Sequence, residues 1–287
     1  MRRRKSSTES SCCASTPLRI QIAAPPNCCA STHLSMNTKP RILAHRGGLL
    51  NAPENTIAAF ELAFSNGAAG VECDIRKTRD GQFIAFHDRT AKRLTGHNWP
   101  IAETGYGQLK HIKVLGKAPI AHLDDILNLL ILNPVRTCYF EPALESPRDA
   151  AGLALEIKKA GVQRRAYILT FAHKTEYLRA AKNAVPDIGA AVMPLLPSNI
   201  LKTALASGAG AVCAGWVPGW AGTRELFKLG AKVFDFKKQI RAAGAAGIEV
   251  SAGVANDYYD VRWLDSEGVS GIWTDDVPMA ARAIYGG

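Results

Sequence analysis

Short apolar runs alternate with helical segments along most of this chain, and no other feature limits its fold as strongly. From residue 41 onward, about eight strand-like runs are each followed by a segment with helical periodicity. Repeated βα units of this kind require a parallel sheet that is covered by helices. Eight such units in roughly 245 residues is the size of one closed (β/α)8 TIM barrel, which is the fold we expect.

The units can be followed by residue number. The strand candidates are 42–44, 71–75, 138–140, 166–169, 188–192, 211–213, 249–252 and 271–273. The helix candidates are 56–66, 123–132, 149–160, 175–183, 198–206, 234–246, 258–266 and 279–284.

An open, doubly wound sheet is the alternative arrangement of βα units. Such a sheet usually carries a glycine-rich phosphate-binding turn after its first strand, and the pair Gly47-Gly48 matches that turn poorly. A hairpin is expected where an Asp-Gly turn leads into the apolar run 83–86. Residues 89–121, between the second and third barrel strands, lack clear periodicity. We therefore expect a short irregular insertion there.

Residues 1–38 differ in composition from the rest of the chain. They are rich in Ser, Thr, Cys and Pro, and the segment Cys-Cys-Ala-Ser-Thr occurs twice, at 12–16 and 28–32. We expect a disordered N-terminal extension, or a start that belongs at Met36. A targeting segment for an organelle is the alternative, because the stretch is rich in Arg and Ser and poor in acids. Residues 39–287 are then expected to form one domain.

The composition argues against a mostly disordered chain, a collagen-like fibre and a small disulfide scaffold. Hydrophobic residues make up 47% and charged residues 21% of the chain, which is an ordinary globular balance. No apolar run reaches the ~18 residues that span a bilayer, so no transmembrane segment is expected. The formal charge is +10, and residues 1–40 contain six basic side chains and one acidic one. The remaining body is mildly basic, which suits an anionic small molecule and gives no sign of a nucleic-acid partner.

The cysteines indicate a reducing compartment. Four of the seven lie as two pairs within residues 1–38, whereas Cys73, Cys138 and Cys213 are scattered singly through the body. This spacing fits free thiols better than a disulfide framework. We therefore expect a cytoplasmic protein, and the sequence leaves its oligomeric state open.

Two carboxylates in the second strand candidate predict a metal site. Glu72 and Asp74 are two residues apart, so in a strand they point to the same face. Neighbouring carboxylates resist ionisation unless a cation neutralises them. Glu141, at the end of the third strand, adds a third oxygen ligand of the kind that Mg²⁺ or Ca²⁺ prefers. The competing interpretation is a solvated acidic edge that pairs with Arg76 and Lys77.

Two histidines follow strand candidates, where the active site of a barrel lies. His45 and His87 each come directly after a short apolar run. They match the needs of one general base and one general acid, although a lone histidine is more often a structural imidazole. Arg46 adjoins His45, and its guanidinium group is suited to gripping a phosphate.

An ordered set of motifs now resembles the signature of the glycerophosphodiester phosphodiesterase family. The set is specific because five motifs occur in the family's order, and looser similarity extends over about residues 40–284. The motifs are 44–47 (Ala-His-Arg-Gly), 53–56 (Pro-Glu-Asn-Thr), 72–74 (Glu-Cys-Asp), 78–81 (Thr-Arg-Asp-Gly) and 87–88 (His-Asp). The looser matches are 169–171 (Leu-Thr-Phe) and 271–276 (Gly-Ile-Trp-Thr-Asp-Asp).

The resemblance implies a TIM barrel that hydrolyses glycerophosphodiesters to glycerol 3-phosphate and an alcohol, in glycerophospholipid breakdown. The short segment between the second and third barrel strands is similar to the compact bacterial members of the family. The resemblance implies one divalent cation, Mg²⁺ or Ca²⁺, held by Glu72, Asp74 and Glu141, with His45 and His87 as the catalytic histidines. The residues implied to bind the substrate and its phosphate are Arg46, Glu54 and Asn55.

The chain departs from the family pattern at the third strand. The family usually has Glu-x-Lys there, and the Lys helps to hold the phosphate, whereas here the run is Glu141-Pro142-Ala143. A lost charge-assisted contact costs about 1.5–3 kcal/mol unless another cation replaces it. Lys174 and His173, just past the fourth strand, are the candidates for that replacement.

Two other functions stay open beside hydrolysis. A barrel that binds a phosphodiester without cleaving it, inactive or re-purposed, is suggested by Ala143, but the intact His45 and His87 argue against it. A related phospholipase-D-like lyase is the other, and the segment 53–56 argues against that. The family's Trp-Thr-Val-Asn near the seventh strand is replaced at 252–256, so the identity of the substrate's alcohol stays open.

Overall fold

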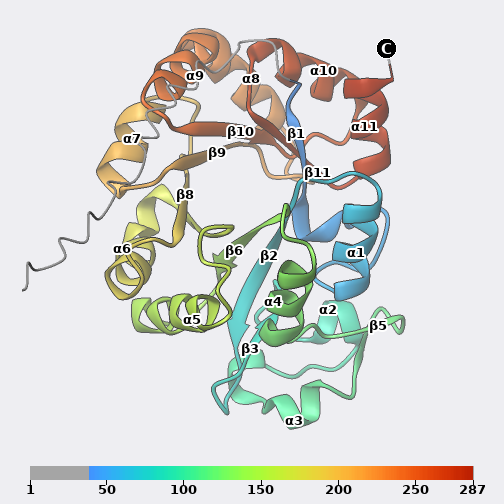
Figure 1. Cartoon of the computed structure of the whole chain (residues 1–287). Helices are drawn as coiled ribbons and strands as arrows, with labels where there is room; N and C mark the ends of the chain where they lie inside the picture. Colours follow the sequence, from blue (N-terminus) through green and yellow to red (C-terminus); the bar gives the residue numbers. More distant parts are fainter. Residues whose placement is uncertain (1–38, 287) are drawn as a thin grey trace, which may run out of the picture. The chain divides into compact units, whose positions relative to one another are not determined.

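A computed structural model of the chain describes residues 39–286, and the expectations for residues 1–38 lie outside the described residues. Eight parallel strands form a ring, which closes because β1 pairs with both β2 and β11 (Figure 1). The expected TIM barrel is therefore confirmed, and the open sheet is excluded. The strands of the ring are β1 (Arg41–Ala44), β2 (Gly70–Lys77), β6 (Thr137–Pro142), β7 (Ala166–Phe171), β8 (Gly189–Met193), β9 (Ala211–Gly215), β10 (Glu249–Gly253) and β11 (Gly271–Thr274).

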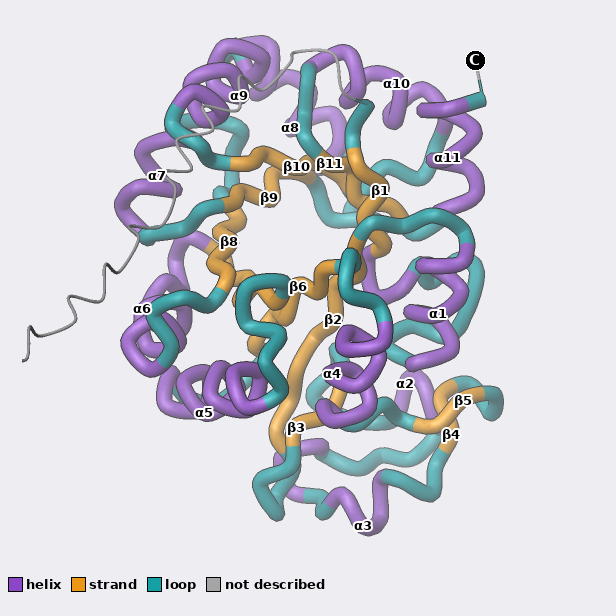
Figure 2. Tube along the Cα trace, in the orientation of Figure 1, coloured by secondary structure: helices purple, strands orange, loops and turns teal. Residues whose placement is uncertain are grey.

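Helices surround the ring on its outer side (Figure 2). Each of the eight predicted helices is present within a few residues of its expected bounds. They are α1 (Ile57–Ser65), α4 (Leu123–Leu132), α5 (Pro147–Lys159), α6 (Thr175–Ala184), α7 (Ile200–Ser207), α9 (Phe236–Ala245), α10 (Tyr258–Glu267) and α11 (Val277–Tyr285). None of the helices described within residues 39–286 is long and apolar enough to cross a bilayer.

One further helix, α8 (Thr223–Val233), lies between β9 and α9 and was not predicted. A (β/α)8 barrel needs one helix after each strand, so the repeat gave no reason to expect a second helix after β9. Gly230 also interrupts the apolar pattern in the middle of α8. The structure explains this glycine, because a Cβ atom there would approach the ring of Pro197 to 3.1 Å.

The insertion after β2 is more regular than expected. The hairpin is present, since β3 (Phe83–Ala85) pairs antiparallel with the end of β2. The segment that follows packs around a small apolar cluster of its own. Its elements are too short to produce a readable periodicity. They are α2 (Lys92–Thr95), the 3₁₀ turn η2 (Ile101–Glu103), α3 (Tyr106–Leu109), β4 (Lys113–Val114) and β5 (Ala118–Pro119).

Local signals explain where several helices begin. The side chains of Thr56, Ser146, Asp257 and Asp276 each accept a hydrogen bond from the backbone N–H three residues further along. These bonds satisfy amide groups that the first turn of a helix leaves without a partner. The helices therefore start at fixed points after their strands, which also fixes the loops that carry the polar residues.

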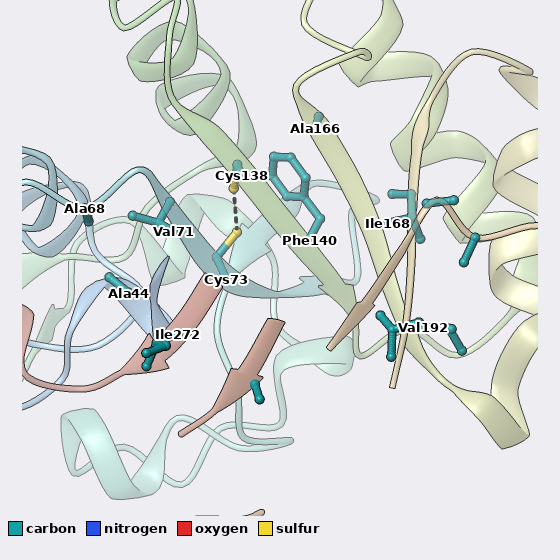
Figure 3. Close-up of a cluster of buried hydrophobic side chains, with 14 of the residues drawn as sticks. Ala44, Ala68, Val71, Cys73, Cys138, Phe140, Ala166, Ile168, Val192 and Ile272 are labelled. Carbon is teal, nitrogen blue, oxygen red and sulfur yellow. Dashed lines mark hydrogen bonds between the residues drawn. The ribbon is translucent and has the colours of Figure 1, made fainter. Parts of the chain in front are cut away.

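Alternate residues of each strand face two different cores. Figure 3 shows the outer core, in which Cys73 and Cys138 of neighbouring strands meet with their sulfur atoms 3.7 Å apart. The inner core fills the barrel with residues such as Tyr139, which stacks on Tyr167 at 4.6 Å and meets the edge of Trp273 at 5.0 Å. The polar residues at the carboxyl ends of the strands therefore lie above a filled apolar interior.

Candidate active site

Three predicted carboxylates meet where β2 and β6 end. Asp74 and Glu141 are direct partners in the register of the two strands, and Glu72 precedes Asp74 by two residues on the same face. Each of the three residues offers an oxygen within 4.8 Å of the others, and Glu72 and Asp74 are buried. The strand geometry thus produces the juxtaposition that the sequence predicts.

Burial makes this cluster hard to ionise without a cation. It raises the pKa of Glu72 well above its ordinary value, and the charges of Asp74 and Glu141 add to the rise. Burial and Asp74 raise the pKa of Glu141 to about 8, while Arg46 and Lys174 act in the opposite direction. The Oε1 atom of Glu72 is buried without a hydrogen-bond partner in the described chain. A divalent cation would satisfy that oxygen and neutralise the cluster, so these residues fit a hard metal ion.

Arg46 occupies a strained turn directly after β1. The short 3₁₀ turn η1 (His45–Gly47) places Arg46 at φ 51°, a left-handed conformation that is uncommon for a side-chain-bearing residue. The turn directs the Arg46 N–H to Oε2 of Glu72 at 3.0 Å. The guanidinium group lies 3.2 Å from Oε1 of Glu54 and 3.2 Å from Oδ2 of Asp74. Arg46 therefore partly neutralises the cluster, and its contact with a phosphate stays a prediction.

His45 is held by a buried carboxylate from the far end of the chain. Its Nδ1 lies 2.7 Å from Oδ1 of Asp275, and its Nε2 lies 4.0 Å from Oε2 of Glu72. Asp275 is itself fixed by Asn256, whose Nδ2 donates to Oδ2 at 2.6 Å and whose Oδ1 accepts from the Asp275 N–H at 2.8 Å. A carboxylate at Nδ1 favours the tautomer that leaves Nε2 free to exchange a proton beside the cluster.

His87 is held by a neighbour in sequence. Its Nδ1 lies 2.7 Å from Oδ1 of Asp88. Asp88 accepts hydrogen bonds from Arg93, which also donates two bonds to Glu54, at 2.9 and 2.7 Å. The Arg93 bonds, opposed by partial burial and aided by His87, lower the pKa of Asp88 to about 2. The imidazole of His87 is 45% exposed, against 19% for that of His45.

Glu54 and Asn55 hold other residues of the site in place. Burial opposes ionisation of Glu54, but the hydrogen bonds from Arg93 and the charge of Arg46 outweigh it and lower the Glu54 pKa. Asn55 is 1% exposed, and its amide makes two bonds to Asp74, one at 2.9 Å to Oδ2 and one at 3.1 Å from the backbone N–H. These contacts orient Arg46 and Asp74. A direct contact of Glu54 or Asn55 with substrate stays a prediction.

Four supporting residues received no role in the sequence analysis. Asp88 adjoins His87, so the pairing was visible as a dipeptide, and Arg93 follows five residues later. Asp275 lies in the motif 271–276 and Asn256 in the segment 252–256, but both are more than 200 residues from His45, and nothing in either segment links it to that histidine. Barrel closure brings Asp275 there, because β1 and β11 pair with Ala44 opposite Thr274, the residues directly before His45 and Asp275.

The surroundings of Ala143 contain other cations. Lys174, in the 3₁₀ turn η3 (Ala172–Lys174) after β7, is close enough to Glu141 to oppose the rise in its pKa. Arg76 donates from Nη1 to the Ala143 carbonyl at 3.2 Å. Arg76 and Arg89 also line a cavity of about 160 Å³ beside Ala143. Positive charge is therefore present near Ala143, although the family lysine is absent there.

The chain is similar in sequence to known proteins. The model of the glycerophosphoryl diester phosphodiesterase family matches residues 45–279. An uncharacterised Bacillus subtilis protein, YqiK, is 27% identical over 85% of this chain and 98% of its own. Human glycerophosphodiester phosphodiesterase 1 is 39% identical over 87 residues, 30% of this chain and 26% of that protein. The chain spans about a quarter of the length of the first curated relatives that it matches.

Solved structures share the fold. A phosphodiesterase from Oleispira antarctica, in complex with the product sn-glycerol 3-phosphate, superposes with a TM-score of 0.70 over 86% of this chain and 97% of its own, at 22% identity. At that identity the likeness shows the barrel alone. The family model covers most of the barrel, from His45 to the beginning of the last helix, and the chain therefore belongs to the glycerophosphoryl diester phosphodiesterase family.

Proposed function

We propose that this protein hydrolyses glycerophosphodiesters to glycerol 3-phosphate and an alcohol, with one divalent cation and two catalytic histidines. The observation that carries the proposal is the meeting of three carboxylates, Glu72, Asp74 and Glu141, with His45 at one mouth of the barrel. Family membership and the glycerol 3-phosphate bound to the Oleispira relative support it.

The cation, Mg²⁺ or Ca²⁺, would be held by the three carboxylates and would offset charge on a phosphate oxygen. Each histidine is bonded to a carboxylate through Nδ1, so each presents Nε2 for proton transfer. One Nε2 takes a proton from the nucleophile, and the other gives a proton to the leaving alkoxide. Asp275 and Asp88 keep the two rings oriented and stabilise their protonated forms.

Arg46 and the two acids around it prepare the site for an anion. Glu54 and Asp74 hold the guanidinium group in place, and a guanidinium group with two bound edges can still present donors to a phosphate oxygen. We therefore assign Arg46 to phosphate binding. Glu54 and Asn55 are positioned to serve the substrate through Arg46 and Asp74.

The domain and its location follow from the same proposal. Residues 39–287 would form the catalytic domain, with residues 1–38 as an extension outside it. Cys73, Cys138 and Cys213, the cysteines of the described chain, are buried and unpaired. Free thiols suit a reducing compartment, which supports a cytoplasmic enzyme acting on products of glycerophospholipid breakdown.

The test is hydrolysis of glycerophosphocholine with Mg²⁺ or Ca²⁺, followed by a coupled dehydrogenase assay for glycerol 3-phosphate. We expect product with at least one cation and none after EDTA. Glu72→Gln should abolish activity and leave the fold intact, because a neutral amide is a poor ligand for a hard cation. Glu61→Gln, on the exposed face of α1, is the matched control.

Three outcomes would count against parts of the proposal. A rate that EDTA does not change would show that the reaction needs no metal ion. Release of phosphocholine in place of choline would assign a different bond. The absence of turnover across a panel of glycerophosphodiesters would instead support a barrel that binds such esters without cleaving them.

A further inference from the structure

The helix α8 carries exposed apolar residues beside its buried side. Phe227 and Ala231 are buried against the barrel, as expected for a helix that covers a sheet. The side of the helix next to the buried one carries Leu226, Leu229 and Val233, which are 58%, 59% and 66% exposed. These three residues follow helical spacing and form a stripe along the outside of the helix.

A neighbouring helix shows what this outer face ordinarily contains. On α6 the inward residues are Leu178 and Ala181, and the outward ones are Glu176, Arg179 and Asn183. Polar side chains on the solvent side are the rule for a helix packed on one side. The exposed apolar stripe of α8 differs from this pattern, and such a stripe indicates a surface that binds a partner.

Exposed apolar residues continue on both sides of α8. Val217 and Trp220 precede it, in the loop after β9, and are 45% and 69% exposed. Phe234, directly after it, is 43% exposed. We call the six residues together the α8 surface. They are Val217, Trp220, Leu226, Leu229, Val233 and Phe234.

Several cations lie near the α8 surface in the chain. Residues 216–246 contain six basic side chains and two acidic ones, and of the basic ones Arg224 and Lys228 are paired with Asp257 and Asp260 outside that range. Lys232, Lys238 and Arg241 are exposed. An apolar stripe flanked by Lys and Arg, with a tryptophan beside it, is the pattern of a helix that lies in the interface of an anionic membrane.

We propose that the α8 surface docks this protein on a bilayer that contains anionic phospholipids. The apolar stripe enters the boundary between headgroups and acyl chains, and the surrounding cations attract the anionic headgroups. Val217 and Trp220 follow the carboxyl end of β9, which is the end of the barrel that carries the three carboxylates. Docking would therefore bring the mouth of the barrel to the lipid surface.

Self-association is the less favourable partner for the same surface. In a twofold dimer the same patch faces itself. The exposed cations Lys232, Lys238 and Arg241 would then lie close to the same cations of the second copy, and like charges opposed across an interface are unfavourable. An anionic bilayer removes this repulsion and replaces it with attraction.

Co-sedimentation of the full chain with phosphatidylcholine vesicles, with and without phosphatidylserine, tests the proposal. The double variant Leu226→Ser and Leu229→Ser should bind at least about tenfold more weakly than the wild type, because two inserted side chains are lost. The matched control is Leu132→Ser with Val135→Ser, which are 78% and 81% exposed before the amino end of β6, and it should bind as the wild type does.

Comparison of the variants is required because residues 1–40 are themselves basic and remain in all of them. Equal binding by the Leu226/Leu229 variant and the wild type would overturn the proposal. Thermal melts by circular dichroism establish that each variant is folded, so the result does not depend on activity. The proposal and the proposed function can therefore fail separately.

A charge-reversal variant tests the second half of the proposal. Lys232→Glu with Lys238→Glu should weaken binding to phosphatidylserine vesicles by about fivefold or more for each charge, and should leave binding to pure phosphatidylcholine unchanged. An equal loss on both kinds of vesicle would contradict the electrostatic part. Light scattering that shows a wild-type dimer, and a monomer for the Leu226/Leu229 variant, would make the surface a protein interface and overturn the proposal.

Discussion

The two histidines of the site make the same bond, yet they are supported by different parts of the molecule. His45 is bonded to Asp275, a residue that is 2% exposed and locked by Asn256. His87 is bonded to Asp88, its neighbour in the chain, within a partly exposed ion network around Arg93. The first support depends on closure of the barrel, and the second depends on a loop and its surface charges.

This difference teaches that equal geometry need not mean equal energy. Water screens the network around His87, so its individual charges contribute little each. The Asp275 carboxylate is shielded from water, where hydrogen bonds are stronger and a lost partner costs more. Because its pKa is lowered in the folded protein, the Asp88 carboxylate stabilises the fold at neutral pH and loses that effect in acid. Its stabilising contribution is complete above its ordinary pKa near 3.8 and is lost as the pH falls through about 2.

The largest expected effects come from removing the histidines themselves. His45→Ala and His87→Ala should each lower kcat by roughly 10²–10⁴-fold, because each removes a proton-transfer group. If both act on one reaction path, the double variant should lose far less than the product of the two single losses. Steady-state kinetics with glycerophosphocholine measure this. Near-wild-type turnover in either single variant would remove that histidine from the mechanism.

Variants of the two supporting aspartates should show that the buried support of His45 matters more for kcat than the exposed support of His87. Asp275→Asn should lower kcat by about 100-fold and Asp88→Asn by about tenfold, since supporting groups of this kind are worth roughly 10–100-fold and the buried one should lie at the upper end. The KM values should change little, and the pH profile of kcat should shift, because the ring's proton affinity changes. A purely structural role would move the melting temperature and leave the profile in place.

Asp124→Asn is a suitable control for these variants, because that side chain is 75% exposed at the start of α4. It should retain the wild-type kcat and pH profile. Equal losses in Asp275→Asn and Asp88→Asn would contradict the difference between the buried and the exposed support.

The sequence predicted the parts of this protein that repeat or lie close together. The βα alternation gave the barrel, and the spacing of Glu72 and Asp74 placed them on one strand face. It could not reveal Asp275 as the partner of His45, because that pair forms only when the last strand closes on the first. It also missed α8, since the barrel pattern is complete without it and Gly230 breaks its periodicity.

The roles of Glu54, Asn55 and Arg46 show a second limit of the sequence. Their motifs are local and easily recognised, but their side chains contact one another and Asp74. Which carboxylate a guanidinium group chooses depends on a left-handed turn at Arg46 that no periodicity encodes. The sequence therefore predicts that these residues matter and leaves their contacts to the structure.

Metal binding should depend on pH, because burial and the neighbouring charges raise the pKa values of Glu72 and Glu141. Without metal the pKa of Glu141 is raised to about 8, so Mg²⁺ must displace a proton at neutral pH. Affinity should rise with pH by up to tenfold per unit for each proton that the cation displaces, and the contribution of Glu141 should level off above about pH 8. Calorimetry in two buffers of different ionisation enthalpy measures the proton release.

The carboxylate variant Glu141→Gln serves as the comparison for that experiment. It should bind the cation more weakly, and the proton release due to Glu141 should be absent. Metal affinity that is independent of pH in the wild type would contradict the raised pKa.

The smallest expected effect concerns the cation that replaces the family lysine at Ala143. Lys174 is exposed, yet close enough to Glu141 to influence its pKa. Lys174→Ala should therefore raise KM for a glycerophosphodiester by only about two- to fivefold, the size of a screened surface contact, and Ala143→Lys should partly restore it. Lys158→Ala, exposed near the end of α5, is the control and should leave KM unchanged. An unchanged KM in Lys174→Ala would end the idea of replacement. A large gain from Ala143→Lys in the wild-type background would instead indicate that the mouth is adapted to a bulkier or less charged phosphodiester.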